Sequence, residues 1–188
     1  MAELAAARAD PACPGAAIIA PAGIGKSRLA REVCAAAEAQ GALTLWAQAT
    51  ACSAAIPLGA LAGVLPAELR SDDTLELIQR SMAFLRAQAG DRHILLAVDD
   101  AHLLDAASAT LVGHLASGSE VFVLVTVRSG EPVPDAVESL WKDGGARRVD
   151  LAEFDDDGIV QLVESGLGGP VEHATAQRVV EMSAGNPL

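Results

Sequence analysis

The chain alternates between short apolar runs and longer segments in which apolar residues recur at helical spacing. Four apolar runs cover residues 16–20, 43–49, 94–98 and 121–126. The sequence VFVLV in the last of these has no polar alternation, which is typical of a strand that helices cover on both faces. Strands separated by helices predict a parallel sheet, and therefore an α/β sandwich.

The segments between these runs predict the helices that cover the sheet. Helices are expected over 26–39, 74–88 and 137–141, and one more lies before the fourth run. Ser71 is the predicted N-cap of the second helix, and Asp105 is the predicted N-cap of the helix before the fourth run. The apolar face predicted for the second helix consists of Leu75, Ile78, Met82 and Leu85.

The composition changes after a last predicted strand at 148–151. Two further helices are predicted for 155–166 and 171–184. We therefore divide the chain into an α/β domain over 1–152 and the start of a helical subdomain, or lid, over 153–188. A chain that stops directly after a Gly-Asn-Pro turn suggests a segment of a longer protein. The inner face of the first lid helix is predicted to carry Ile159, Leu162 and Val163.

The strongest chemical motif lies between the first apolar run and the helix that follows it. The sequence APAGIGKS has the form of a phosphate-binding P-loop, except that Ala20 replaces the usual first glycine. Glycines let backbone N–H groups turn toward phosphate oxygens, and the helix N-terminus adds positive partial charge. Lys26 is predicted to reach the β and γ phosphates, and Ser27 to hold Mg²⁺ through its hydroxyl. The predicted phosphate-binding residues are Pro21, Ala22, Gly23, Ile24, Gly25, Lys26 and Ser27.

A pair of carboxylates, Asp99 and Asp100, follows the third apolar run, as in a Walker B motif. Strand ends face the ligand crevice in open α/β sheets, so Asp99 is predicted to join the Mg²⁺ site. Asp100 is placed to polarise the attacking water as a general base. The alternative interpretation of this pair is a helix N-cap after a core strand.

The distance along the chain between these motifs limits the type of ATPase. About seventy residues separate Lys26 from Asp99 and contain one further strand, which is typical of P-loop ATPases with an additional central strand. A GTPase is disfavoured because Asn186 is the only Asn, which excludes an Asn-Lys-x-Asp motif. The next strand ends in Val125-Thr126-Val127-Arg128, where a polar or cationic side chain could sense the γ-phosphate. The alternative for Arg128 is a solvated arginine after a strand.

The net charge limits the partners that the chain can bind, and the cysteines indicate its compartment. Asp and Glu outnumber Lys and Arg by 25 to 13, which gives a formal charge of −12. Such a surface repels phosphate backbones and anionic lipid, so we expect no direct binding of nucleic acid or membrane. Cys13, Cys34 and Cys52 match neither a disulfide framework nor a zinc site and are predicted to be buried free thiols. Free thiols fit a reducing compartment. Together with the lack of a signal-peptide pattern, they predict a cytoplasmic protein.

Taken together, these motifs resemble the nucleotide-binding domain of the AAA+-like signal-transduction ATPases with numerous domains (STAND). The resemblance is to the large, MalT-like ATP-binding regulators of the LuxR family. It rests on residues 20–28, on 53–65 (SAAIPLGALAGVL), on 94–105 (ILLAVDDAHLLD), on 126–128 and on the final GNPL.

The resemblance implies roles for three further residues and a mode of action. Arg28 would belong to the nucleotide site, Arg128 would act as the first sensor and Pro187 would lie against the nucleotide. ADP would hold a closed form, and exchange for ATP would open it toward self-association and transcriptional control. The winged helix, the repeats and the helix-turn-helix of such regulators would lie outside this chain.

Three functions follow from these expectations. The leading one is a slowly hydrolysing regulatory module that uses ATP, ADP and Mg²⁺. The second is a nucleotide-binding module without useful hydrolysis. The third is a small P-loop phosphotransferase, which the lack of an arginine-rich lid disfavours.

Overall fold

The computed structural model describes residues 1–66, 69, 73–118 and 120–183. Its centre is a sheet of five parallel strands in the order β2-β3-β4-β1-β5. The α/β fold with a central parallel sheet is therefore confirmed. The strands are β1 (Gly15–Ala20), β2 (Leu43–Gln48), β3 (Ile94–Asp99), β4 (Val121–Arg128) and β5 (Arg147–Asp150).

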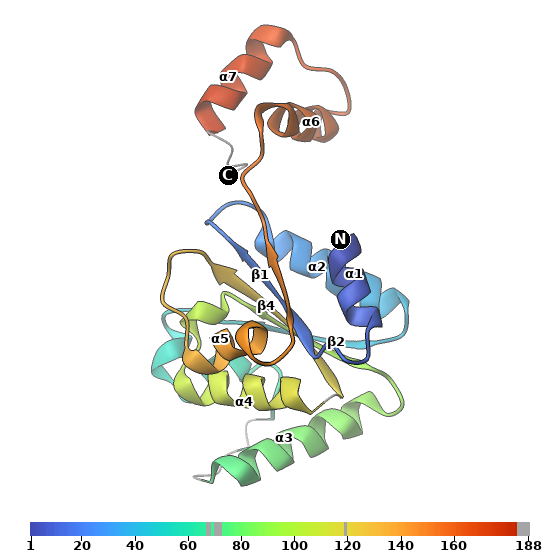
Figure 1. Ribbon diagram of the computed structural model, residues 1–188, viewed down its shortest axis with the longest axis vertical. Coiled ribbons are helices and arrows are strands. Elements are labelled where there is room, and N and C mark those ends of the chain that lie inside the picture. The colour runs from blue at the N-terminus through green and yellow to red at the C-terminus, as the bar shows by residue number, and fades with distance from the viewer. Residues whose placement is uncertain (67–68, 70–72, 119, 184–188) are drawn as a thin grey trace.

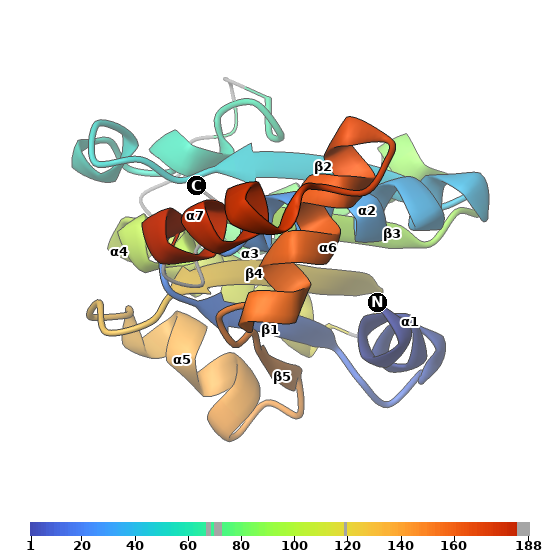
Figure 2. The ribbon, with the colours of Figure 1, turned by 90° about the horizontal axis from the view of Figure 1, so that it is seen from above.

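Helices cover both faces of this sheet and make three layers (Figures 1 and 2). On one face, α1 (Ala2–Ala9) and α2 (Lys26–Ala39) enclose one apolar core with β1, β3 and β4. On the other face, α3 (Thr74–Ala89), α4 (Ala106–Ser117) and α5 (Asp135–Lys142) enclose the larger core. The short helices η1 (Ser53–Ala55), η2 (Gly59–Leu61) and η3 (Ala101–Leu103) lie in the connections.

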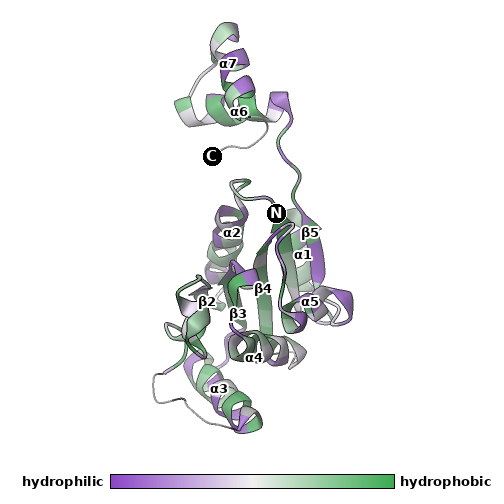
Figure 3. Ribbon diagram, turned by 90° about the vertical axis from the view of Figure 1, so that its left-hand side faces the viewer, coloured by the Kyte–Doolittle hydropathy of each residue, from purple (hydrophilic) through white to green (hydrophobic). Residues whose placement is uncertain are grey.

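The burial of the strands follows from this layering. All six residues of β1 and all six of β3 are buried, which explains why both strands are apolar up to Asp99 at the end of β3. The central strands are correspondingly hydrophobic in Figure 3, whereas β5 at the sheet edge is polar. Charged side chains on an edge strand discourage pairing with another sheet.

The position of β4 is the feature that shapes the rest of the fold. It lies between β1, which precedes the P-loop, and β3, which precedes the aspartate pair. The additional central strand predicted from the spacing of the two motifs is thus present. Because all strands are parallel, the carboxyl ends of β1, β3 and β4 meet at one edge of the sheet.

The predicted face of α3 is partly wrong. Leu75 is 62% exposed. Leu85 is buried as predicted, and Leu77 and Ser81 are buried beside it. The apolar pattern missed Ser81 because serine is polar. Its hydroxyl donates to the Leu77 carbonyl at 2.7 Å, and this bond allows the residue to be buried in the core. The N-cap is Asp73, whose carboxylate accepts from two backbone N–H groups. The predicted cap, Ser71, lies outside the described residues.

Two helices, α6 (Asp156–Leu167) and α7 (His173–Ser183), follow β5 and lie beyond the end of the sheet (Figure 1). They pack against each other and bury Ile159, as predicted for the inner face of α6. Leu162 instead is 39% exposed, because it faces the cleft described below. The cysteines also differ from the prediction, since only Cys34 is buried, Cys13 is half-buried and Cys52 is exposed.

Candidate nucleotide-binding site

The loop between β1 and α2 has the backbone conformation that a P-loop requires. Gly23 and Gly25 have φ angles of 87° and 94°, in the left-handed region where residues with a Cβ are strained. Gly25 is the N-cap of α2, so the first N–H groups of this helix face the loop. Ala20 is the last residue of β1 and has no positive φ, so alanine replaces glycine there without backbone strain.

Lys26 lies under this loop and is 93% shielded, with a relative exposure of 7%. Its ammonium group donates a hydrogen bond to the carbonyl of Pro21 at 2.7 Å. Burial lowers the pKa of Lys26 below 10.5, and the carboxylates of Asp100 and Asp99 oppose this shift. A buried cation at the N-terminus of a helix is suited to an anionic ligand.

Ser27 and Asp99 are brought together at the carboxyl edge of the sheet. The Ser27 hydroxyl donates to Oδ1 of Asp99 at 2.8 Å. The Thr126 hydroxyl, at the end of β4, donates to the same oxygen at 2.6 Å. Asp99 is 4% exposed, so these two hydrogen bonds hold its carboxylate in one orientation.

Asp100 has the unusual backbone of this site. Its φ is 55°, in the left-handed region, and its N–H donates to the Thr126 hydroxyl at 2.9 Å. Its carboxylate accepts a hydrogen bond of 3.4 Å from the amide of Gln48, at the end of β2. Asp100 precedes η3 without a side-chain capping bond, and α4 is capped by Asp105 as predicted. Asp100 thus occupies the N-cap position of η3, as in the alternative interpretation of the pair, but its carboxylate does not cap the helix and lines the cleft instead.

Arg128 and His102 lie at the mouth of the site. The Arg128 side chain is 51% exposed and lies 3.7 Å from the carboxylate of Glu131. The backbone N–H of Arg128 donates to Nδ1 of His102 at 3.5 Å. Burial lowers the pKa of His102, and the nearby charge of Asp100 opposes this shift. The guanidinium thus remains accessible from the cleft that it lines.

A cleft of about 1150 Å³ lies between the P-loop and α6. Its floor is the loop and the first turns of α2, including Arg28 and Glu32. Its far wall is apolar and includes Phe154 and Leu162. One end of the cleft therefore holds Lys26 and the N-terminus of α2, and the other end is apolar, which matches the phosphates and the base of a nucleotide.

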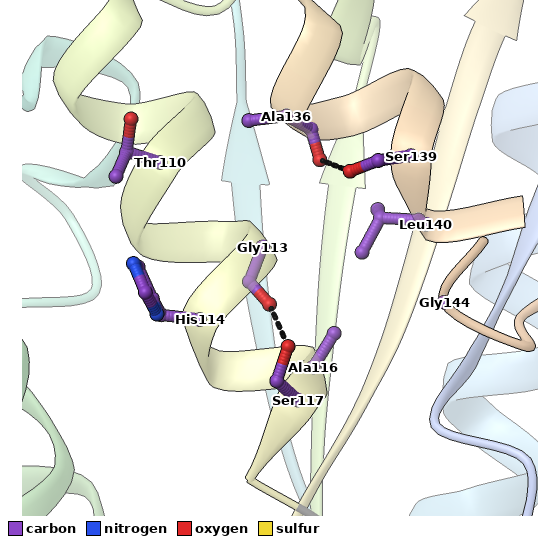
Figure 4. Close-up of a pocket in the computed structure, with 9 residues that line it drawn as sticks. All are labelled: Thr110, Gly113, His114, Ala116, Ser117, Ala136, Ser139, Leu140 and Gly144. Atoms are coloured by element: carbon purple, nitrogen blue, oxygen red, sulfur yellow. Dashed lines mark hydrogen bonds between the residues drawn. The ribbon is translucent and has the colours of Figure 1, made fainter. Parts of the chain in front are cut away.

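Two smaller cavities lie elsewhere. One of about 250 Å³ lies between α4 and α5 and is lined by small residues with His114 (Figure 4). Another of about 630 Å³ lies at the opposite edge of the sheet, near Cys13 and His93. Neither is lined by a P-loop residue or by a member of the aspartate pair.

The donor set fits Mg²⁺ only together with a phosphate ligand. Among the described residues, no group of three or more His, Cys, Asp and Glu side chains could hold a metal ion. Mg²⁺ in nucleotide sites is bound by one or two protein oxygens together with phosphate oxygens and water. Ser27 and Asp99 supply such oxygens beside the P-loop.

The structure assembles most of the predicted site residues and adds two. P-loop residues from Ala22 to Arg28, together with Asp100 and Arg128, line the cleft, and Asp99 lies directly behind it. Pro187 lies outside the described residues. No role was predicted for Gln48. Thr126 was named only as part of the strand end that carries Arg128, with no role of its own. Only the polarity of these residues at strand ends could have indicated their roles.

Comparison with known proteins decides the family. The sequence profile of the AAA ATPase domain matches residues 1–126, which include the P-loop and the aspartate pair. The chain belongs to the AAA ATPase domain family. A search of curated protein sequences finds no match to it.

Solved structures agree with this AAA ATPase domain in fold. AMPPCP-bound DnaA from Aquifex aeolicus matches with a TM-score of 0.61 and 16% identity, over 96% of this chain and 54% of that one. A Thermotoga maritima RuvB variant gives 0.59 and 19%, over 92% and 50%. Drosophila ORC bound to DNA gives 0.56 and 18%, over 95% and 47%. This AAA ATPase domain thus spans about half the length of the chains that it matches.

Within the described part of this AAA ATPase domain, no helix is long and apolar enough to cross a membrane.

Proposed function

We propose that the chain is an ATP-binding, slowly hydrolysing switch module of a signal-transduction ATPase. The observation that carries this proposal is the Ser27–Asp99 hydrogen bond beside a glycine loop that contains a buried lysine. These groups would hold the phosphates and Mg²⁺ of ATP or ADP. Arg28 would contact the nucleotide from the first turn of α2, where it lines the cleft.

Hydrolysis would depend on Asp100 and Arg128. Asp100 faces the cleft from the end of β3, where its carboxylate can accept a proton from a water molecule near the γ-phosphate. Arg128 lines the same cleft with an accessible guanidinium, which can compensate the charge on the γ-phosphate. Because ADP lacks that phosphate, Arg128 would distinguish the two nucleotides.

The switch would operate between two parts of the chain, an α/β domain over 1–152 and a lid over 153–188. Residues of both parts line the cleft, with Phe154 and Leu162 from the lid side. A ligand that contacts both parts favours the arrangement in which both contacts form. ATP and ADP would differ in the arrangement that they favour, and Pro187 would contact the nucleotide from the end of the lid.

The wider context of the proposal is a LuxR-type transcriptional regulator. It is supported by the resemblance in 53–65 and 94–105 and by the similarity of the fold to that of AAA ATPases. In that setting the module would act in the cytoplasm and associate with itself. DNA would be bound by a helix-turn-helix in another part of a longer protein, since this chain carries a charge of −12.

Calorimetric titration with MgATP and MgADP tests the proposal. We expect micromolar binding to the wild-type chain and at least a tenfold loss in Lys26→Ala, which removes a buried charge from the phosphate site. Lys142→Ala is the matched control, because Lys142 is exposed and pairs with Glu138 on α5. Folded protein without nucleotide affinity would contradict the proposal.

Hydrolysis needs a second measurement. Phosphate release that disappears in Asp100→Asn while nucleotide binding persists would support a switch that hydrolyses ATP. Binding without release in the wild type would identify a module that only binds nucleotide. Release of ADP that depends on an added acceptor would identify a phosphotransferase.

A further inference from the structure

We propose that Glu32 binds the ribose of the nucleotide and makes the site selective for ribonucleotides over 2′-deoxyribonucleotides. Glu32 belongs to α2 and lines the cleft together with the P-loop. The proposal rests on the nucleotide-binding function proposed above and adds a residue that recognises the sugar. It concerns affinity alone, so it does not depend on hydrolysis.

The carboxylate of Glu32 differs from the other two carboxylates that line the cleft, those of Asp100 and Asp150. Arg148 donates to both oxygens of Asp150, at 2.8 and 2.9 Å. Asp100 accepts a hydrogen bond from Gln48 and lies at the end of β3. Within the described part of the chain, Glu32 makes no hydrogen bond or ion pair. Its two oxygens are therefore available to a ligand.

Helix geometry places Glu32 at the level of the sugar. The proposed phosphate site lies at the N-terminus of α2, which begins at Lys26. Glu32 lies about 9 Å further along the helix axis, at about 1.5 Å per residue. Side chains of a helix lean toward its N-terminus, so this carboxylate extends back toward the phosphates. The ribose directly follows the phosphates of a nucleotide, and the base would lie at the apolar end with Phe154 and Leu162.

Arg28 and Glu32 lie on the same face of α2, because residues four positions apart are neighbours on a helix. Both line the cleft, and Leu29 lines it between them. No ion pair joins the two side chains among the residues that the structure describes. A cation near the phosphates, followed along the helix by a free carboxylate, matches two consecutive parts of one nucleotide.

The chemistry of ribose fits a carboxylate. An ionised carboxylate only accepts hydrogen bonds, and its two oxygens can accept from two neighbouring hydroxyl groups. Acidic residues bind ribose hydroxyls in this way in dinucleotide sites. Hydrogen bonds to an ionised group are stronger than those between neutral groups. Without such donors, the negative charge of Glu32 would only repel the phosphates of the ligand.

Calorimetric titration with ADP, 2′-deoxy-ADP and pyrophosphate, each with Mg²⁺, tests the proposal. We expect the wild-type chain to bind ADP about tenfold or more tightly than 2′-deoxy-ADP, because the missing hydroxyl removes a bond to a charged group. In Glu32→Ala this ratio should fall to within twofold of one. Glu32 is exposed on a helix, where alanine is favourable, so the variant is expected to fold. Glu38→Ala is the matched control, because Glu38 is exposed on α2 outside the cleft lining and should leave the ratio unchanged.

Pyrophosphate separates recognition of the sugar from the effect of charge. Loss of a carboxylate reduces repulsion of any phosphate ligand, so Glu32→Ala should bind pyrophosphate at least as tightly as the wild type. Its affinity for ADP relative to pyrophosphate should fall about tenfold or more. If Glu32 acted through its charge alone, the substitution would change the affinities for ADP, 2′-deoxy-ADP and pyrophosphate by the same factor. That result would overturn the proposal.

A second comparison separates the sugar from the base. Inosine diphosphate lacks the amino group of adenine and keeps the ribose. The preference of the chain for ADP over inosine diphosphate should therefore be the same in the wild type and in Glu32→Ala. A change in this preference, with the preference over 2′-deoxy-ADP unaltered, would mean that Glu32 contacts the base and would overturn its role at the sugar.

The remaining outcomes distinguish this proposal from the one on which it rests. Equal affinity of the wild-type chain for ADP and 2′-deoxy-ADP would overturn recognition of the sugar and leave the proposed nucleotide site intact. A preference for ADP that persists in Glu32→Ala would show that another residue recognises the ribose. A folded wild-type chain without affinity for ADP would overturn the proposed function and this proposal together.

Discussion

The hydroxyl of Ser27 and the carboxylate of Asp99 meet at 2.8 Å, although 72 positions separate them in sequence. Ser27 lies in the first turn of α2, and Asp99 is the last residue of β3. The strand that leads into the P-loop, β1, and the strand that ends in Asp99, β3, are not neighbours, because β4 lies between them. The contact therefore spans the central strand at the carboxyl edge of the sheet, where the P-loop ends.

The first prediction concerns the metal. Asp99→Asn keeps the size of the side chain and removes the charge that a divalent cation needs. We expect Mg²⁺ to raise the affinity of the wild-type chain for ATP, and this gain to fall at least tenfold in the variant. Calorimetric titrations with and without Mg²⁺ measure the gain.

A matched carboxylate provides the control for this experiment. Asp143 is the exposed residue after α5 and lies outside the cleft lining. Asp143→Asn should therefore keep the full gain from Mg²⁺. An equal gain in the wild type and in Asp99→Asn would exclude Asp99 from the metal site.

The two motifs could be predicted from sequence because each is local. Continuous apolar runs mark strands that are covered on both faces, and the glycines and Lys26 between a strand and a helix indicate the P-loop. The place of Asp99 in the site could be predicted because it directly follows a continuous apolar run. These parts of the fold and the site need no knowledge of which strands are neighbours.

The parts that sequence analysis missed depend on three-dimensional context. Thr126 and Gln48 contact the aspartates only because β4 and β2 both lie beside β3. Helix α1 was not predicted, since it is short, rich in alanine and fixed mainly by the burial of Leu4 and Ala7. Leu75 was placed in the core because an apolar pattern cannot include the buried Ser81.

The second prediction concerns the choice between ATP and ADP. Arg128→Ala removes a cation that lines the cleft and lies 3.7 Å from Glu131. Because only the γ-phosphate distinguishes the nucleotides, we expect the affinity ratio of ATP to ADP to fall about fivefold or more, consistent with loss of one charge-assisted contact. The affinity for ADP should stay within twofold.

Arg92→Ala is the control for a lost arginine, since Arg92 donates to backbone carbonyls at the end of α3. It should leave the ratio unchanged. Equal losses of affinity for ATP and ADP in Arg128→Ala would show that Arg128 does not act through the γ-phosphate.

The third prediction concerns thiol reactivity. Burial, with a smaller effect from Glu38, raises the pKa of Cys34 to about 11, whereas Cys52 is exposed. At pH 8 only about one Cys34 thiol in a thousand is ionised, and the thiolate is the reactive form. We expect iodoacetamide to modify Cys52 at least a hundredfold faster than Cys34.

Peptide mapping by mass spectrometry measures this difference. Unfolding in urea should remove the protection of Cys34 and provides the internal control. Similar rates for the two thiols in the folded chain would contradict the burial of Cys34 between α2 and the sheet.

The fourth prediction concerns the free-energy cost of burying the charged ammonium of Lys26 when no nucleotide is bound. Desolvation lowers its pKa in the folded chain below the 10.5 of an exposed lysine. Between the lowered value and 10.5 the unfolded chain binds more protons, so this group makes the free energy of unfolding rise with pH. Below the lowered pKa the full cost of the buried charge remains. Lys26→Met removes that cost together with the bond to Pro21.

Urea unfolding at pH 7 and at pH 10 of the wild type, Lys26→Met and Lys142→Met tests this prediction. The free energy of unfolding of the wild type, relative to Lys26→Met, should be higher at pH 10 than at pH 7. Lys142, the only other lysine, is exposed and paired with Glu138, so its substitution controls for loss of a lysine. A relative stability that falls from pH 7 to pH 10 would mean that the folded chain favours the charged form of Lys26. The ammonium would then be stabilised by Asp100 and Asp99 more than burial destabilises it, and the P-loop would need no anion to balance its lysine.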